Sequence, residues 1–351
     1  MLNVATENEF DFLSQEYALL RDHARATAFQ HPIWLDRFYT HLPPNRNAEP
    51  LIVTLRENGM LKAVFPLIRR RKTGLILVET TDLGVSDYAA PIIHEDIVAH
   101  DRVQIVDRLR EALGTYDILR IRPVREENCD DWQWIIKDQP IELDFSAHAS
   151  ELRSSFAEWR TSNLDASISG QTTRKLKKWN KQSKVELTLL TDRDEIQGAI
   201  SKLAILRAGR FDGDLVQTDK AEKFYADVAQ SGDDSFVQTW RLTSDNEVAG
   251  VLFGVTDRGR FLYLLIGCDY DGFGRYSPGL QMYDGIIKHW MEMGGNCFDF
   301  TIGDEPFKEK FGSNPTSMFA FIESGSLKGR VAVELMKRKL RNARAKVGEL
   351  A

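Results

Sequence analysis

The hydrophobic pattern of the first half changes from helical to strand-like and back again. Apolar residues first recur at helical spacing, and then run together or alternate in short stretches bounded by turn residues. Asn58-Gly59 lies between two of these stretches and is typical of a two-residue hairpin turn. The pattern predicts helices over 8–23, 32–42 and 101–113, and strands over 51–55, 61–69, 75–80 and 117–122.

The second half repeats this order of patterns. Residues 53–65 resemble 239–253 as a hairpin pattern, and 109–122 resemble 289–303 as helix, glycine and strand. The repeat predicts two copies of one mixed α/β domain, 1–147 and 148–351, although chance likeness of two ordinary hairpin-and-helix units is the alternative. The predicted helices cover 175–181, 193–209, 218–230, 280–293, 306–311 and 330–347, and the predicted strands cover 185–190, 236–242, 247–255, 260–268, 297–302 and 318–323.

Composition narrows the class of protein. The 351 residues are 42% hydrophobic and include 19 Phe and 7 Trp, which is enough to fill two cores and excludes a disordered chain. A net charge of −6 disfavours a general nucleic-acid binder, so no DNA partner is expected. The three cysteines and seven histidines show no metal-ligand spacing, so no metal is expected. Neither a signal-like start nor a membrane-spanning apolar run is present, which favours a cytoplasmic location.

A glycine-containing loop precedes the predicted helix 280–293. The loop ends in Ser277-Pro278-Gly279, and the N-terminus of a helix attracts anions such as phosphate. Arg275 would add a guanidinium beside it. The alternative is a simple cap and turn.

Three motifs in this region carry a family resemblance. YSPGLQM (276–282), FDFTIGD (298–304) and FKEKF (307–311) follow one another, and the sequence is similar to the CelD-like branch of the GNAT acyltransferase superfamily. The layout also resembles the Fem-type aminoacyltransferases. The early stretches 29–39 and 82–93 and the basic stretch 172–181 fit the same resemblance. It implies tandem GNAT-like folds, each a mixed, mostly antiparallel sheet flanked by helices.

The resemblance implies direct acyl transfer. An amine or hydroxyl would attack the thioester of acetyl-CoA or another acyl-CoA, with no covalent enzyme intermediate, so no Ser-His-Asp arrangement is needed and none is evident. Two departures stand out: 275–279 reads R-Y-S-P-G instead of the usual phosphate-binding motif, and Phe307 replaces a tyrosine that could protonate the leaving thiolate. The residues implied in donor binding are Ile266, Gly267, Arg275, Tyr276, Ser277, Pro278 and Gly279.

Five further residues are candidates for chemistry or acceptor binding. Asp299 lies in an apolar strand, which suits a general base or a structural carboxylate that holds a loop or an arginine. Lys308 could contact a CoA phosphate or a substrate carboxylate, or be a solvated lysine. Asp304 is a candidate for substrate binding or for capping the helix from residue 306. Asp87 and Tyr88 are candidates for acceptor binding, or form a turn.

The acceptor is expected to be a small molecule or a sugar, by association with cell-envelope or exopolysaccharide synthesis in the family that the sequence resembles. Basic runs over 174–184 and 337–346 would suit CoA phosphates, a nucleotide-linked sugar or the surface of a membrane, or be solvated helix faces. A Fem-type aminoacyltransferase that uses aminoacyl-tRNA is the alternative enzyme, although no long heptad run is present. A non-catalytic binding protein on the same fold is the other alternative.

Overall fold

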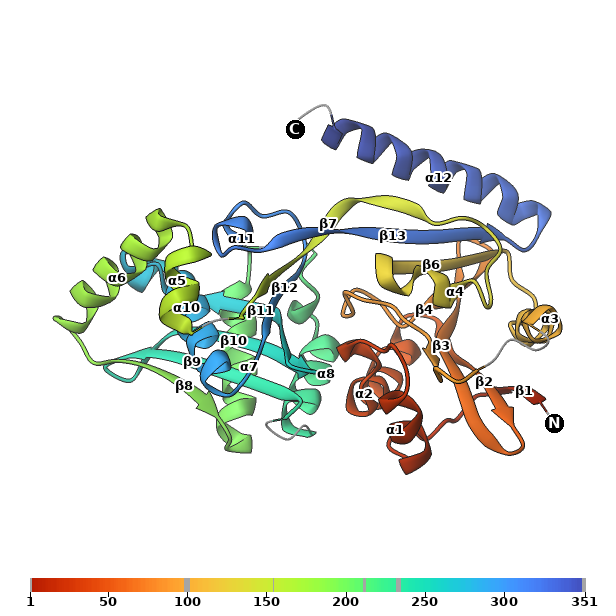
Figure 1. Cartoon of the computed structure of the whole chain (residues 1–351), viewed down its shortest axis with the longest axis horizontal. Helices are drawn as coiled ribbons and strands as arrows, with labels where there is room; N and C mark the ends of the chain where they lie inside the picture. The colour runs from red at the N-terminus through yellow and green to blue at the C-terminus, as the bar shows by residue number, and fades with distance from the viewer. Residues whose placement is uncertain (1, 98–101, 154, 211–212, 232–234, 349–351) are drawn as a thin grey trace. The chain divides into compact units, whose positions relative to one another are not determined.

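The computed structural model describes residues 2–97, 102–153, 155–210, 213–231 and 235–348. The chain divides into two compact units (Figure 1). Unit 1 comprises Met1–Ser146 and Thr316–Ala351, and unit 2 comprises Ala147–Pro315. Each unit is built on a β-sheet with helices on its faces, and each is described by itself below.

The sheet of unit 1 is mostly antiparallel. Its strands lie in the order β1-β2-β3-β4-β6-β13, and β4 and β6 are its parallel pair. The short β5 pairs with β3 outside this order. The strands are β1 (Leu2–Glu7), β2 (Ala48–Glu57), β3 (Met60–Lys72), β4 (Leu75–Thr80), β5 (Ile92–Ile93), β6 (Ile118–Arg125) and β13 (Asn314–Ser324).

Side chains alternate between the two faces of this sheet. One face carries Val53, Phe65 and Leu119 in a cluster with α3 and α4. The other face carries Ile52 and Val64 against α1 and α2, and separately a small cluster under α12. The helices are α1 (Gln15–Asp22), α2 (Pro32–His41), α3 (Arg102–Ala112), α4 (Cys129–Trp132) and α12 (Leu327–Gly348), with 3₁₀ turns η1 (Ala28–Gln30), η2 (Pro43–Asn45) and η3 (Glu126–Asn128).

The sheet of unit 2 follows the order β7-β12-β11-β10-β9-β8, in which β11 and β12 run parallel and the other neighbours run antiparallel. The strands are β7 (Ile141–Glu151), β8 (Val185–Leu190), β9 (Val237–Ser244), β10 (Glu247–Asp257), β11 (Arg260–Cys268) and β12 (Cys297–Ile302).

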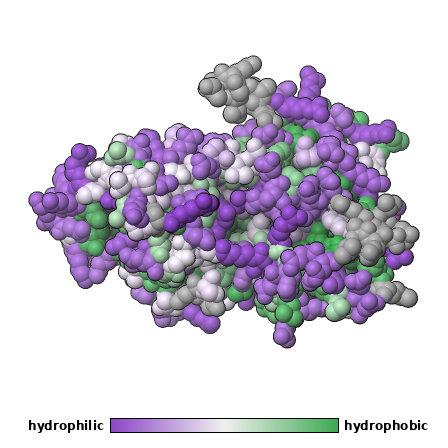
Figure 2. All heavy atoms as spheres, viewed as in Figure 1, coloured by the Kyte–Doolittle hydropathy of each residue, from purple (hydrophilic) through white to green (hydrophobic). Residues whose placement is uncertain are grey.

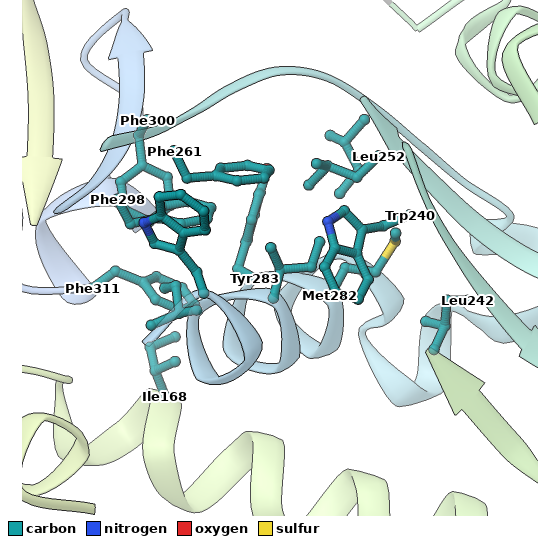
Figure 3. Packing of buried hydrophobic residues seen from close by; sticks show 14 of the residues in the cluster. Ile168, Trp240, Leu242, Leu252, Phe261, Met282, Tyr283, Phe298, Phe300 and Phe311 are labelled. Carbon is teal, nitrogen blue, oxygen red and sulfur yellow. The ribbon is translucent and has the colours of Figure 1, made fainter. Parts of the chain in front are cut away.

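Helices cover this sheet too. On one face α10 supplies Met282 and Tyr283 to a core that also contains Trp240, Phe298 and Phe300 (Figure 3). Helices α7 and α8 pack together, and α7 packs against β10 and β11. The helices are α5 (Phe156–Ser162), α6 (Ala166–Asn180), α7 (Arg193–Arg207), α8 (Asp219–Ser231), α9 (Tyr270–Phe273), α10 (Pro278–Glu292) and α11 (Phe307–Lys310), with 3₁₀ turns η4 (Leu215–Gln217) and η5 (Gly274–Tyr276).

The two units share one topology. In unit 1 the antiparallel strands β2, β3 and β4 lead through α3 to β6, which runs parallel to β4. In unit 2 the antiparallel strands β9, β10 and β11 lead through α10 to β12, which runs parallel to β11. Each parallel pair is joined at three residue pairs. The structure thus confirms the predicted fold class, a duplicated mixed α/β fold with a mostly antiparallel sheet.

The chain is divided differently from the prediction at its C-terminal end. We assigned residues 148–351 to the second domain, but Thr316–Ala351 cluster with unit 1. Val333 of α12 is buried beside Leu77 and Ile118 of unit 1. The predicted division after residue 147 lies inside β7, one residue from the observed division between Ser146 and Ala147.

Most of the residues that reach the surface are hydrophilic on the face drawn in Figure 2. Within the described ranges, no helix combines the length and apolar character needed to cross a membrane.

Candidate functional site

The two parallel strands of unit 2 separate soon after they meet. Their pairing runs from Arg260 with Cys297 to Leu262 with Asp299. From there β11 continues to Cys268 without β12 as a neighbour. On its other edge β11 stays paired with β10, with an irregularity where Leu265 and Tyr263 face successive residues of β10. The edge of β11 that faces β12 is therefore released from the sheet over its last residues.

Thr301 holds the point of separation. Its N–H donates to the Asp299 carboxylate over 2.8 Å, and its hydroxyl donates to the backbone oxygen of Tyr263 over 3.2 Å. Its φ of 59° lies in the left-handed region, which is unfavourable for a β-branched residue. Surrounding contacts must hold such a conformation, and conformations of this kind cluster at functional sites.

Two tyrosines lie beside this point. The rings of Tyr263 and Tyr283 meet edge to face, with centroids 5.2 Å apart. The two hydroxyls are hydrogen-bonded to each other. Burial raises the pKa of Tyr263 to about 12, so this hydroxyl is protonated at neutral pH. Phe307, the predicted position of a missing hydroxyl, stacks on Tyr283 at 5.3 Å.

The N-terminus of α10 lies at the other end of β11. Ser277 adopts the left-handed conformation (φ 56°, ψ 61°) directly before Pro278, which occupies the first helical position. The Ser277 hydroxyl does not cap the helix; it accepts hydrogen bonds from Lys175 Nζ at 2.6 Å and Gln171 Nε2 at 3.2 Å. The Lys175 ammonium therefore lies at the N-terminus of α10. The positive charge of the lysine and the helix N-terminus both favour binding of an anion.

The basic helix α6 is fixed to this loop by aromatic stacking. Trp179 stacks on Tyr276 with centroids 4.7 Å apart, and the Tyr276 hydroxyl bonds to the side chain of Gln182. The Arg275 guanidinium lies 4.8 Å from the centre of the Tyr276 ring. Tyr276 is thus a buried anchor, whereas Arg275 is exposed beside it.

Tyr270 was not among the predicted site residues. Its hydroxyl is hydrogen-bonded to the Cys268 sulfur, and a methyl group on the buried Gly279 would lie 3.0 Å from that hydroxyl. Burial raises the pKa of Tyr270, and the side chain is still 45% exposed. Sequence reasoning missed Tyr263, Tyr270 and Tyr283 because tyrosine is common in cores, and only the fold brings the three hydroxyls near one another beside β11.

Asp299 is held in a structural arrangement. Its side chain is 1% exposed, one carboxylate oxygen accepts from Arg260 Nη1 at 2.9 Å, and the other accepts from the Thr301 N–H. A carboxylate that is buried, paired and hydrogen-bonded points at its partners and not at a substrate. This arrangement favours the structural role for Asp299, in which it holds an arginine and a loop, over the role of general base.

Lys308 is buried and makes hydrogen bonds to the segment that follows β12. Its ammonium donates to the backbone oxygens of Ile302 at 2.8 Å and Gly303 at 2.9 Å, and pairs with Glu305 at 2.9 Å. Its side chain is 2% exposed, so it is not the solvated lysine of the sequence prediction. Its three donors are directed to the protein, which disfavours contact with a CoA phosphate.

Asp304 bonds to a buried histidine. The Asp304 carboxylate lies 2.9 Å from His148 Nε2, and His148 Nδ1 lies 3.4 Å from the Ser313 hydroxyl. The predicted capping role is wrong, because the first residue of α11 is preceded by Pro306 with no side-chain cap. A Ser-His-Asp line is therefore present, contrary to the sequence reading. Its serine is buried and its aspartate is 46% exposed, which is the reverse of what a nucleophilic serine needs.

Ile266 and Gly267 contact α7. The Ile266 carbonyl accepts from Arg207 Nη1 at 2.9 Å, and Arg207 pairs with Asp214 at 2.8 Å. A methyl group on Gly267 would lie 2.9 Å from Leu206 Cβ, so glycine is needed there for close packing. This geometry explains both residues without a ligand.

Asp87 and Tyr88 belong to unit 1. The Tyr88 side chain is 1% exposed, and its ring packs against Phe29 and lies under the Arg125 guanidinium at 4.9 Å. Tyr88 is thus part of a core, and Asp87 beside it is only partly exposed. Their role in acceptor binding stays a prediction.

Metal chemistry finds no support in the described ranges. No group of three or more His, Cys, Asp or Glu side chains lies there in an arrangement that could hold a metal ion.

Comparisons with known proteins agree with this geometry. Residues 167–309 match the model of the acetyltransferase (GNAT) domain. No curated protein sequence matches the chain. Among solved structures, FemX is similar with a TM-score of 0.63 and 10% identity, over 94% of this chain and 99% of FemX.

Two further structures share the fold. L-PGS from Bacillus licheniformis has a TM-score of 0.57 and 12% identity, over 96% of this chain and 98% of its own. A tandem GNAT protein from the clavulanic acid biosynthesis pathway has a TM-score of 0.51 and 10% identity, over 93% of this chain and 99% of its own. At these identities the likeness concerns the fold alone, and the CelD-like branch stays a prediction. Residues 167–309 thus resemble a GNAT acetyltransferase domain, in a chain whose fold is similar to those of FemX and of a tandem GNAT protein.

Proposed function

We propose that this protein transfers an acetyl or other acyl group from acyl-CoA to an amine or hydroxyl. The observation that carries the proposal is the separation of β11 and β12 after three residue pairs, with Lys175 at the N-terminus of α10. The match of residues 167–309 to the GNAT acetyltransferase domain supports it.

The residues present fit an acyl donor with phosphate groups. The N-terminus of α10 offers first-turn N–H groups, Lys175 adds positive charge at Ser277, and the exposed Arg275 lies two residues before it in the chain. The released edge of β11 offers backbone groups to an extended chain, as in strand addition. The thioester supplies an activated acyl group and a thiolate that leaves readily.

The reaction needs one proton removed and one returned. The nucleophile attacks the carbonyl carbon, the C–S bond breaks, and the proton of the nucleophile must pass to a base. We assign that role to Glu305, an exposed carboxylate that pairs with Lys308 at 2.9 Å and whose charge acts on Tyr263. The Tyr263 hydroxyl, protonated at neutral pH and oriented by Tyr283, would protonate the thiolate. It thus replaces the hydroxyl missing at Phe307.

The finer assignments follow from the resemblance. We propose a sugar or another intermediate of envelope or exopolysaccharide synthesis as acceptor, a cytoplasmic location, and peripheral contact of the basic helix α12 with a membrane. These proposals are independent of acyl transfer. Each of them can be wrong while the proposal of acyl transfer holds.

Calorimetric titration with acetyl-CoA tests the donor. We expect saturable binding by the wild type, weakened at least tenfold by Lys175→Glu, because a charge-assisted hydrogen bond contributes about 1.5–3 kcal/mol and 1.4 kcal/mol is tenfold. Lys178→Glu reverses an exposed charge on the same helix and is the matched control. Gly279→Trp should abolish binding, since even a methyl group there meets the Tyr270 hydroxyl.

An aminoacyl-tRNA donor is the second candidate, favoured by the similarity to FemX and by the basic face of α6. Binding of aminoacyl-tRNA, with no acetyl-CoA binding at millimolar concentration, would replace the acyl-CoA proposal. Absence of both would leave a non-catalytic binding protein.

A further inference from the structure

A gap between two helix layers exposes part of the sheet in unit 1. On one face α1 and α2 cover Ile52 and Val64, and α12 covers Leu77 and Ile118. Alternation along the strands places Ile68, Glu79 and Arg120 on this same face, in a row across β3, β4 and β6. The three strands are labelled in Figure 1. Here a cavity of about 150 Å³ lies in place of a helix.

Arginines dominate the lining of this cavity. Arg70 comes from β3, Arg120 and Arg122 come from β6 two residues apart, and Arg46 follows η2. Glu79 and Asp82 are the carboxylates among them. Four guanidinium groups and two carboxylates leave a surplus of two positive charges, even with both acids ionised.

The carboxylates are already engaged. Glu79, 5% exposed, pairs with Arg70 Nη2 at 2.8 Å and with Arg120. Asp82 accepts from the Gly84 N–H at 2.7 Å, and burial raises its pKa above the ordinary value. The Arg122 side chain has a buried Nε without a hydrogen-bond partner among the described residues, as do Arg70 and Arg120. A buried donor without a partner is costly unless a ligand or water satisfies it.

We propose that this cavity binds a phosphate group. A phosphate dianion matches the surplus of two charges, and its oxygens accept the paired N–H groups of arginine forks. The volume equals that of about five water molecules at roughly 30 Å³ each, which suits one phosphate group with little room for more. Any remainder of the ligand would project outside the cavity. The turn that closes one end has Leu83 and Gly84 both at positive φ, so its shape is specific.

The site is distinct from the acyl-donor site in unit 2, and it does not rest on the proposed function. Titration of the full chain with inorganic phosphate, at constant ionic strength in chloride buffer, tests it. We expect saturable binding that Arg122→Gln weakens at least tenfold. Arg71→Gln removes the same charge from an exposed position of β3 and should leave the affinity unchanged.

Two more arms make the test specific. Titration with uridine diphosphate in place of phosphate shows whether the phosphate group belongs to a larger ligand. Binding that is tighter than that of phosphate, and that Arg122→Gln also weakens, supports the proposal and indicates that the bound phosphate group is part of a nucleotide. Lys175→Glu should leave phosphate binding unchanged, and Arg122→Gln should leave acetyl-CoA binding unchanged. If Arg122→Gln fails to fold, judged by circular dichroism, Arg46→Gln in the loop after η2 takes its place.

Three results would overturn the proposal. The wild type binds neither phosphate nor uridine diphosphate saturably; the folded cavity variant binds as the wild type does; or Lys175→Glu abolishes phosphate binding, which would place the anion at α10.

Discussion

Replacement of Asp299 by asparagine separates a structural carboxylate from a catalytic one. Asparagine has nearly the same shape, and its side-chain oxygen can still accept from the Thr301 N–H. The substitution therefore removes the charge that faces Arg260 Nη1 at 2.9 Å and little else.

The expected loss of stability follows from the burial of this pair. Hydrogen bonds to charged groups contribute about 1.5–3 kcal/mol. The Asp299 side chain is 1% exposed but that of Arg260 is 28% exposed, so water can partly solvate the guanidinium left behind. We therefore expect a loss of about 2 kcal/mol in the free energy of unfolding of unit 2. For a unit of this size each 1 kcal/mol lowers Tm by about 2–4 °C, which gives a fall of about 4–8 °C.

Urea denaturation followed by tryptophan fluorescence measures this loss, with Asp271→Asn on an exposed position as the matched control. Arg260→Gln should cost more, about 3–5 kcal/mol, because it leaves a buried carboxylate without its cation. The double variant should then recover part of that loss. The structural role is refuted if Asp299→Asn keeps wild-type stability and loses acyl transfer to any acceptor that a screen identifies.

Further expected outcomes concern packing, catalysis and pH. Gly267→Ala should destabilise unit 2 by about 1–3 kcal/mol in urea denaturation through a clash with α7, whereas Gly274→Ala, with its nearest neighbour at 3.6 Å, should not; equal effects would contradict the packing argument. Tyr263→Phe should lower kcat at least tenfold with little change in acetyl-CoA affinity, and Tyr283→Phe should do so less; an unchanged kcat for Tyr263→Phe removes it as the acid. Burial raises the pKa of Cys268 from 9.0 to about 12, so the folded state holds this proton more tightly than the unfolded chain. The contribution of this thiol to stability is complete below pH 9 and is lost as pH rises toward 12. Between pH 9 and 11, Tm of the wild type should therefore fall more steeply than Tm of Cys268→Ala. Parallel Tm profiles of the two proteins would contradict this linkage.

Local pattern predicts the elements that carry a strong local signal. The strands β8, β11 and β12 were predicted at their observed bounds, because each is a short apolar stretch between turn residues. The strand β7 was missed although Ile141, Leu143 and Phe145 alternate. Its neighbours β12 and β13 come more than a hundred residues later, so nothing in its own sequence distinguishes a shared strand from a linker.

The candidate site shows the same limit. Sequence alone suggested an anion site at Ser277 and the helix after it, because loop and helix are adjacent in the chain, and this site stays a prediction. It left the role of Asp299 open, since the deciding partner, Arg260, lies 39 residues earlier. It left Lys308 between a contact to a phosphate or carboxylate and a solvated lysine, because the carbonyl oxygens that bury it are presented only once β12 has formed. Partners brought together by tertiary structure thus decide each role.

The return of the chain to unit 1 sets an order for synthesis on the ribosome. Residues 1–146 emerge before unit 2, yet β6 stays without β13 and Ile118 without Val333 until residues 316–351 leave the exit tunnel. Unit 2 is contiguous over Ala147–Pro315 and has all its residues earlier. We therefore expect the later-encoded unit to finish folding before the earlier one, and a nascent chain stalled at residue 315 to expose an unpaired strand edge that chaperones recognise.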